Sequence, residues 1–185
     1  MTQMKFGPLM QHGYVVADAA KAAAEWSERL GIGPFYLLPT VVEDYLYRGT
    51  KSKLDLLVGM SYWNDIQIEV IQPVGDGESL YTEAVRTGSG ALNHQAVLVS
   101  NINVVVRDSN LEKFVVHRGS SAGLAFLYLE NYLPDGSHLE LIDADARILR
   151  TFDAVQTLCR TWDGSRPVRH ARELSADLAA LSRSR

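Results

Sequence analysis

The chain has 185 residues, of which 46% are hydrophobic, and a formal net charge of −4 at pH 7. This composition suits one compact soluble fold, and the absence of basic clusters favours neither nucleic acid nor a membrane surface as a partner. Cys159 is the sole cysteine and excludes an internal disulfide, and no apolar run approaches the roughly 20 residues of a membrane helix. Because residues 1–5 lack the long apolar region of a signal peptide, we expect a cytoplasmic protein.

The first segment predicts a strand followed by a helix. Residues 10–16 are rich enough in β-branched side chains for a strand. Asp18 then stands where an N-cap belongs, and Gly31 ends the alanine-rich stretch 19–30. A strand–helix pair therefore opens the chain.

A run of short strands follows the Gly33-Pro34 break. Their predicted ranges, separated by turn-forming residues, are 35–38, 44–47, 54–60 and 66–71. A polar stretch at 73–78, a short helical pattern at 79–86 and the glycine-rich breaker 88–90 then predict a link to a second module.

The second half repeats this order. We expect a strand over 92–99, a helix over about 101–113 despite its three consecutive valines, and strands near 114–117, 123–130 and 138–142. After residue 145 the pattern predicts two helices, 146–161 and 171–181. Leu174, Leu178 and Leu181 form one stripe on the last helix, which therefore packs on its own core or on a partner subunit.

Each half begins with a strand that carries a histidine and ends with a strand that carries a glutamate. These residues are His12 and Glu69 in the first half and His94 and Glu140 in the second. Side chains alternate along a strand, so Glu69 lies opposite Ile66, Ile68 and Val70, and Glu140 lies opposite Leu139 and Leu141. Both glutamates are predicted to point away from the face that the helices cover.

The repeat predicts one cleft that receives all four side chains. A buried carboxylate is costly unless it is paired or bound to a metal, and imidazole with carboxylate is a donor set for divalent cations. The alternative is that each of these residues is an ordinary surface or core residue. The agreement of residue type, order and face in both halves favours the metal site.

The chain resembles the vicinal oxygen chelate superfamily of glyoxalases, methylmalonyl-CoA epimerases, extradiol dioxygenases and bleomycin-resistance proteins. The resemblance covers about residues 9–145. It rests on the segments Gln11-His12-Gly13-Tyr14-Val15-Val16, Leu30-Gly31-Ile32-Gly33-Pro34-Phe35, Ile68-Glu69-Val70-Ile71-Gln72-Pro73, Leu92-Asn93-His94-Gln95-Ala96-Val97 and Pro134-Asp135-Gly136-Ser137-His138-Leu139-Glu140-Leu141.

The resemblance implies an α+β fold in which paired βαβββ modules form a curved mixed sheet around a metal cleft, with the helices outside. The domain would span 1–145, with modules at about 9–73 and 91–145 joined by a linker at 74–90, and a C-terminal helical extension would occupy 146–185. It also implies that His12, Glu69, His94 and Glu140 are the metal ligands, and the glyoxalase and epimerase branches match this set best.

One divalent ion, Zn, Ni, Co, Mn or Fe, would hold neighbouring oxygen atoms of a small, partly apolar substrate. Proton removal would then give a metal-stabilised enolate in an isomerase, epimerase or lyase. Glu43, Glu69 and Glu140 are the candidate bases. The alternatives are a non-haem Fe(II) extradiol-type dioxygenase and a non-catalytic small-molecule binder. Members of this superfamily are often homodimers, so we expect one here.

Overall fold

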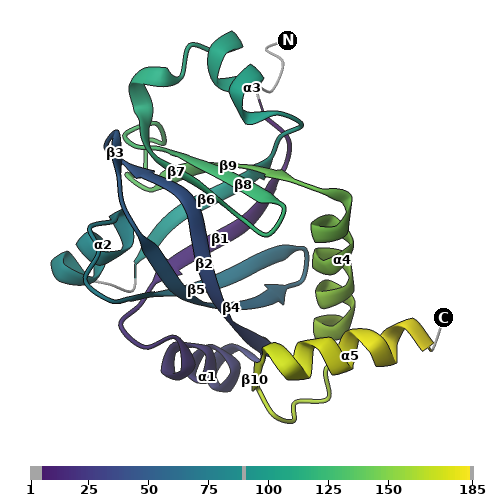
Figure 1. Cartoon of the computed structure of the whole chain (residues 1–185). Helices are drawn as coiled ribbons and strands as arrows, with labels where there is room; N and C mark the ends of the chain where they lie inside the picture. Colours follow the sequence, from purple (N-terminus) through teal and green to yellow (C-terminus); the bar gives the residue numbers. More distant parts are fainter. Residues whose placement is uncertain (1–5, 89–90, 184–185) are drawn as a thin grey trace.

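Two βαβββ modules contribute their strands to one continuous curved sheet (Figure 1). This computed structural model describes residues 6–88 and 91–183, so the N-terminal residues 1–5 and most of the predicted breaker 88–90 lie outside the described residues. The first module consists of β1 (Leu9–Val15), α1 (Ala19–Leu30), β2 (Phe35–Tyr47), the short β3 (Thr50–Lys51), β4 (Leu54–Trp63) and β5 (Ile66–Val74).

The second module repeats the order of the first. Helix α2 (Leu80–Gly88) links it to the first module, and it consists of β6 (Leu92–Leu98), α3 (Ile102–Asp108), a 3₁₀ turn (Glu112–Phe114), β7 (Val115–Ser121), β8 (Leu124–Leu129) and β9 (His138–Ala144). The extension contains α4 (Ala146–Arg160), β10 (Val168–His170) and α5 (Ala171–Arg183). The predicted α+β fold with paired modules and a helical extension is confirmed, whereas the boundary at residue 145 stays a prediction.

Strand pairing explains why the sheet curves. The strand order is β10-β2-β4-β5-β1-β6-β9-β8-β7, and β2 also pairs with β7, which brings the two ends of the sheet together. Strands β1 and β6 pair antiparallel at the centre, while β5 and β9 lie parallel to β1 and β6. Strands β5 and β9 therefore flank the central β1–β6 pair at which the two modules join.

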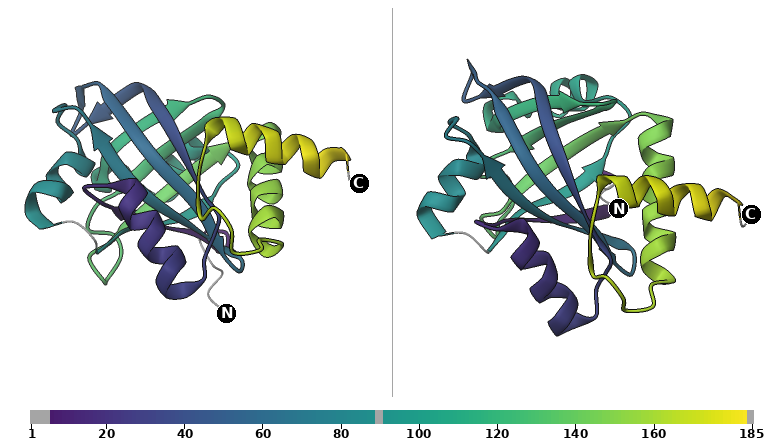
Figure 2. Two further views of the ribbon diagram at one scale, coloured as in Figure 1. Left: turned by 90° about the horizontal axis from the view of Figure 1, so that it is seen from below. Right: turned by 60° about the horizontal axis from the view of Figure 1, so that its bottom comes forward.

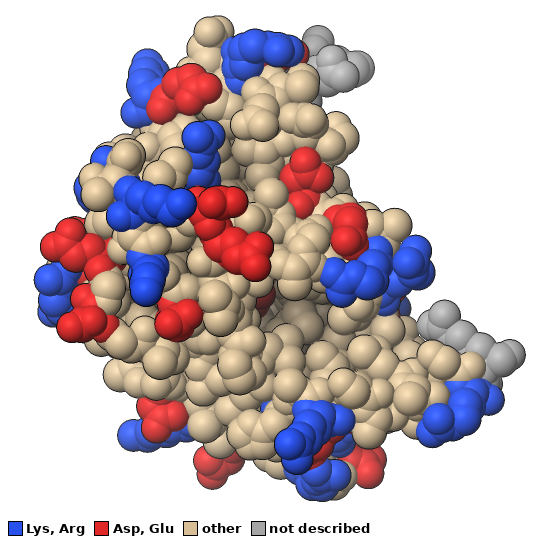
Figure 3. All heavy atoms as spheres, viewed as in Figure 1, with Lys and Arg blue, Asp and Glu red and all other residues tan. Residues whose placement is uncertain are grey.

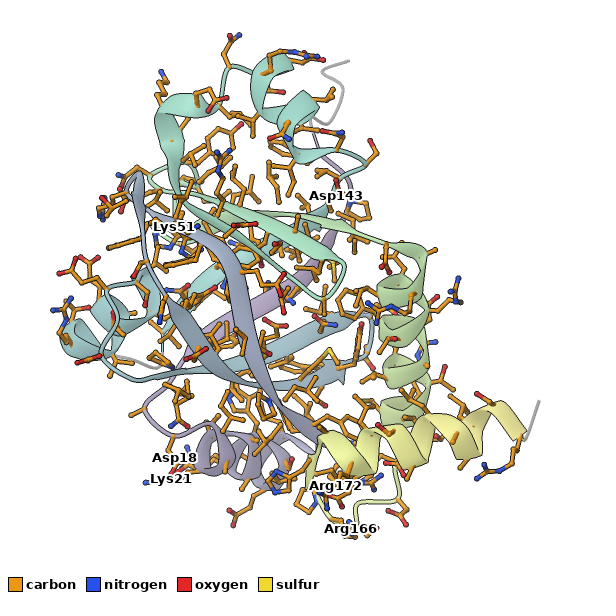
Figure 4. All side chains as sticks on the ribbon, in the orientation of Figure 1. Asp18, Lys21, Lys51, Asp143, Arg166 and Arg172 are labelled. Carbon is orange, nitrogen blue, oxygen red and sulfur yellow. The ribbon has the colours of Figure 1, made fainter. Side chains whose placement is uncertain are left out.

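Helices α1 and α3 cover the outer face of the sheet (Figure 2). Asp18 caps α1 as predicted, because its side chain accepts a hydrogen bond of 2.9 Å from the Lys21 amide, and both residues lie at the start of this helix (Figure 4). Ala19 and Ala23 of α1 are fully buried with Ile68 and Val70 of β5. The other side chains of β5 consequently face the concave side.

Strand β2 differs from the prediction of two short strands at 35–38 and 44–47. It runs without interruption from Phe35 to Tyr47, and a bulge replaces the expected turn. Asp44 has a φ of 48°, and the register with β7 shifts between Glu43 and Leu46. The bend aims the second half of β2 at β7. Residues 38–42 lie between the part paired with β10 and the part paired with β7.

The C-terminal extension packs on its own chain. Strand β10, which the sequence did not predict, lies parallel to β2. Val155 of α4 is fully buried against Tyr36 and Met60, and Leu174 and Leu178 of the predicted stripe belong to the same cluster. No helix in the ranges 6–88 and 91–183 has the length and apolar character needed to span a membrane.

Candidate active site

A cavity of about 650 Å³ opens on the concave side of the sheet. Figure 3 shows a hollow in the middle of this face, surrounded mainly by uncharged side chains. Glu69 and Glu140 lie on its floor together with Gln11 and Tyr128, and Glu43 is an exposed residue at its outer part. Most of the remaining wall is apolar, so polar groups converge at one end of an apolar space.

Two rows of paired residues position the polar end. Across β5, β1, β6 and β9, the first row contains Gln67, Gln11, Ala96 and Glu140, and the second contains Glu69, Gly13, His94 and His138. Residues paired in register share a face of the sheet. The alternation predicted for Glu69 and Glu140 is thus confirmed, and both face the concave side.

His94 is the centre of this arrangement and is completely buried. Its Nε2 atom lies 3.1 Å from Gln11 Oε1 and 3.2 Å from Glu140 Oε2. Its Nδ1 atom lies 3.2 Å from the hydroxyl oxygen of Tyr128, which accepts a hydrogen bond of 2.9 Å from the Tyr81 hydroxyl. The tyrosines therefore fix the orientation of the imidazole ring.

The structure does not bring His12 to this group, which corrects the sequence-based expectation. His12 pairs with Ile68 and Gln95, which lie on the outer face, whereas its neighbour Gln11 faces the cavity. The reason is that successive side chains of strand β1 point to opposite faces of the sheet, so only one of two adjacent residues can face the cavity. Gly13 was the available signal, because a glycine in a strand marks the close approach of another group and shares its face with Gln11.

Burial sets the charge state of the site. Desolvation raises the pKa of Glu69 to about 7. Desolvation, and then the charge of Glu69, raises the pKa of Glu140 well above its usual range. Burial lowers the pKa of His94 to about 3, so the imidazole is neutral at pH 7. Among the described residues that line the cavity, none is a lysine or an arginine, and these carboxyl groups have no basic partner there.

A second buried histidine lies behind the cavity wall. His117 is 1% exposed and lies among Tyr45, Tyr81, Phe126 and Tyr128. Its Nδ1 atom lies 3.1 Å from the Tyr45 hydroxyl oxygen, and its Nε2 atom has no hydrogen-bond partner within the described residues. Burial lowers the pKa of this histidine well below its usual range.

The model of one protein family matches residues 10–128, namely the glyoxalase/bleomycin resistance protein/dioxygenase superfamily. The chain belongs to this superfamily. No curated protein sequence matches it significantly. Two solved structures share the fold. A hypothetical protein from Bacillus halodurans is 17% identical, with a TM-score of 0.53 over 75% of this chain and 94% of that one. The methylmalonyl-CoA epimerase of Mycobacterium tuberculosis is 17% identical, with a TM-score of 0.50 over 81% and 96%.

The superfamily fold raises the question of whether this site suits a divalent cation. The donors are one imidazole nitrogen, one amide oxygen and two carboxylates, a mixed set that suits several divalent metals. The buried carboxyl groups without a basic partner fit a cation. Within residues 6–88 and 91–183, no three His, Cys, Asp or Glu side chains are already arranged around one point. Glu69, His94 and Glu140 are therefore not gathered around one point, and Gln11 Oε1 is a further oxygen donor 3.1 Å from His94 Nε2, on the face where His12 was expected.

Proposed function

We propose that this superfamily member is a metal-dependent isomerase, epimerase or lyase that acts on a small, partly apolar substrate with two neighbouring oxygen atoms. The observation that carries the proposal is the buried group of Gln11, His94 and Glu140, with Glu69 on the same cavity floor. These residues combine nitrogen and oxygen donors that suit a divalent cation with carboxylates that face the cavity. The ion is Zn, Ni, Co, Mn or Fe.

Gln11, Glu69, His94 and Glu140 would hold the cation. When bound, it would polarise the substrate oxygens and acidify the adjacent C–H bond. Tyr128 would keep the His94 ring in place through Nδ1, 3.2 Å from its hydroxyl oxygen. The ligand Gln11 and the supporting residue Tyr128 were both absent from the predicted set.

A carboxylate next to the substrate would take the proton. Glu69 and Glu140 both line the cavity floor, and either can hold a proton at a carboxylate oxygen while it is transferred between two positions of the substrate. Glu43 is the third candidate from the sequence, and its exposed position gives it access to the entrance instead of the floor. We therefore assign the proton transfer to Glu69 or Glu140.

Metal content tests the ligand set, and His12 supplies a matched control. Purified protein is loaded with Mn²⁺, Co²⁺, Ni²⁺ or Zn²⁺ and dialysed, and the bound ion is measured by elemental analysis. We expect His94→Ala and Gln11→Ala to lose bound metal and His12→Ala to retain it. Retention by His94→Ala, or loss by His12→Ala, would overturn the set.

Exchange of substrate hydrogen tests the reaction class. The neutral hydroxyketones acetoin and benzoin carry adjacent oxygens, and incorporation of deuterium from D₂O is followed by NMR with metal-loaded protein. Exchange that Glu69→Gln and Glu140→Gln reduce would support the proposal. Oxygen uptake with catechol would instead identify a dioxygenase.

The oligomeric state and cellular location stay predictions. We propose a homodimer in the cytoplasm. Light scattering of the full chain measures the oligomeric state. Because Leu174 and Leu178 pack on the chain's own core, the surface that a second subunit contacts would lie elsewhere.

A further inference from the structure

Helix α4 forms one wall of the cavity that contains Glu69 and Glu140. Its residues Ile148, Thr151 and Phe152 line the same space. This helix begins at Ala146 and lies outside the part of the chain that the family model matches, which ends at residue 128. The wall therefore comes from the extension that follows the two βαβββ modules.

Several contacts hold α4 in place. The Asp145 side chain accepts a hydrogen bond of 2.8 Å from the Ile148 amide, and the Asp145 amide donates to the Gly123 carbonyl oxygen at 3.0 Å. Val155 is fully buried against β2 and β4. Anchoring at the N-terminus and along the buried face of α4 indicates a fixed wall.

A cluster on α5 and β10 supports the same wall from behind. The Tyr36 hydroxyl donates to Asp177 Oδ2 at 2.8 Å, and Arg169 Nη1 donates to the same oxygen at 2.7 Å. These bonds tie α5 and β10 to strand β2, while α5 also contacts α4. The extension thus closes one end of the concave face as a unit.

The carboxyl groups of Glu43, Glu69 and Glu140 line the cavity, and none of the described lining residues is a lysine or an arginine. Arg147, which lies beside the wall, donates to the Ala122 carbonyl oxygen and pairs with Asp145. The labelled Arg166 and Arg172 lie near α5, away from the hollow (Figure 4). An anionic ligand would therefore find no lysine or arginine among the described lining residues to pair with its charge.

We propose that α4 restricts this site to compact, uncharged substrates with an apolar body and excludes anionic ones such as acyl-CoA thioesters. The inference deepens the proposed function and rests on it for the reaction at the polar end. The ligand class follows independently, from the apolar wall of Ile148 and Phe152 and from the lack of lysine and arginine among the described lining residues. A cavity of about 650 Å³ lies within the range of small-molecule sites.

Two fluorescent probes that differ in one charged group test the charge preference. N-phenyl-1-naphthylamine is neutral, and 8-anilino-1-naphthalenesulfonate has the same ring system with a sulfonate. We expect the neutral probe to bind at least about tenfold more tightly, and propionyl-CoA to fail to displace it. Equal affinities, or displacement by propionyl-CoA, would overturn the proposal.

Substitutions on α4 test its role as the wall. Ile148→Trp fills the cavity, and we expect it to weaken the neutral probe about tenfold. Ala146→Trp places the same side chain at an exposed position of α4 and should leave the affinity unchanged. Thr151→Arg should reverse the preference in favour of the sulfonate. Circular dichroism of each variant verifies folding, and wild-type affinity in both Ile148→Trp and Thr151→Arg would exclude α4 as the wall.

The two proposals can fail separately. Probe affinities are measured with and without EDTA. Binding of the neutral probe to the apolar wall does not require a bound metal ion. If the protein holds no metal but still prefers the neutral probe, the ligand class stands and the proposed reaction does not. If the protein holds metal but binds the sulfonate probe more tightly, the proposed ligand class fails and the proposed reaction is unaffected.

Discussion

The His94 ring lies directly on Gly13 of the neighbouring strand. A Cβ atom at position 13 would come within 1.8 Å of His94 Cε1 and within 2.2 Å of its Nε2. The close approach lets the imidazole, which projects from β6, contact Gln11 on β1 and Glu140 on β9. Gly13 is therefore part of the site although it has no side chain.

Gly13→Ala should displace the His94 ring. Because the ring is buried and cannot move away freely, we expect a loss of about 1–3 kcal/mol in the free energy of unfolding and a loss of metal binding. Urea denaturation and elemental analysis measure the two effects. Gly7→Ala is the control. Gly7 is exposed, and a Cβ atom there would lie 3.3 Å from the Leu98 carbonyl oxygen, so the substitution should be nearly neutral. An unchanged Gly13→Ala protein would show that His94 has room to move.

The Tyr36, Arg169 and Asp177 cluster should stabilise the extension. Tyr36→Phe removes one hydrogen bond and leaves Asp177 paired with Arg169, so we expect a cost of about 1 kcal/mol. Asp177→Ala leaves a buried hydroxyl and a largely buried guanidinium without their acceptor and should cost about 2–3 kcal/mol. Chemical denaturation of both single variants and the double variant gives the coupling free energy between Tyr36 and Asp177. Additive effects would contradict a shared network.

His117 should make stability depend on acid pH. Its pKa is lowered by burial, so below about pH 6.5 the unfolded chain takes up a proton that the folded chain does not. Stability should therefore fall as the pH drops below that value, by about 1.4 kcal/mol per pH unit for this group. His117→Phe should remove this part of the slope between pH 6.5 and 5, and His170→Phe, at an exposed histidine, should not. Equal slopes in both variants would contradict a neutral His117.

Glu69 should give the metal-free protein the opposite pH dependence at higher pH. Its folded pKa of about 7 exceeds the unfolded value, so the stability present below about pH 4.5 is lost as the pH rises to 7. In EDTA, Glu69→Gln should be more stable than the wild type above pH 7 and should lose this slope. Added Mn²⁺ should raise the melting temperature of the wild type more at pH 8 than at pH 5. A metal effect that does not change with pH would argue against Glu69 as a ligand.

The sequence predicted the elements whose signals are local. The cap at Asp18 and the glycine at Gly31 fixed the bounds of α1, where Gly31 has a φ of 66°. Alternation within β5 and β9 placed Glu69 and Glu140 on the correct face. These signals involve neighbouring residues in the chain, so they need no knowledge of tertiary contacts.

The errors arose where long-range packing decides. Residue type favoured His12 over Gln11, but the pairing of β1 with β5 and β6 selects the face. His117 sits beside Arg118 in the sequence, yet the pairing of β7 with β2 and β8 buries it. Strand β10 has only three residues and exists because it pairs with β2, about 130 positions earlier in the chain. Apart from Gly13 in β1, these contacts have no local signature.

Residues 38–42 of β2 pair with β4 on one side, and the other side, between β10 and β7, bears on how the protein avoids self-association. An open sheet edge exposes backbone donors and acceptors to which an extended segment of another molecule can add. Pro39 removes one donor from this stretch, and the adjoining parts of β2 are occupied by β10 and β7. The same residues line the cavity entrance. Removal of the chain beyond residue 145 would lengthen this exposed edge and favour aggregation, so the extension also protects the protein in its unliganded form.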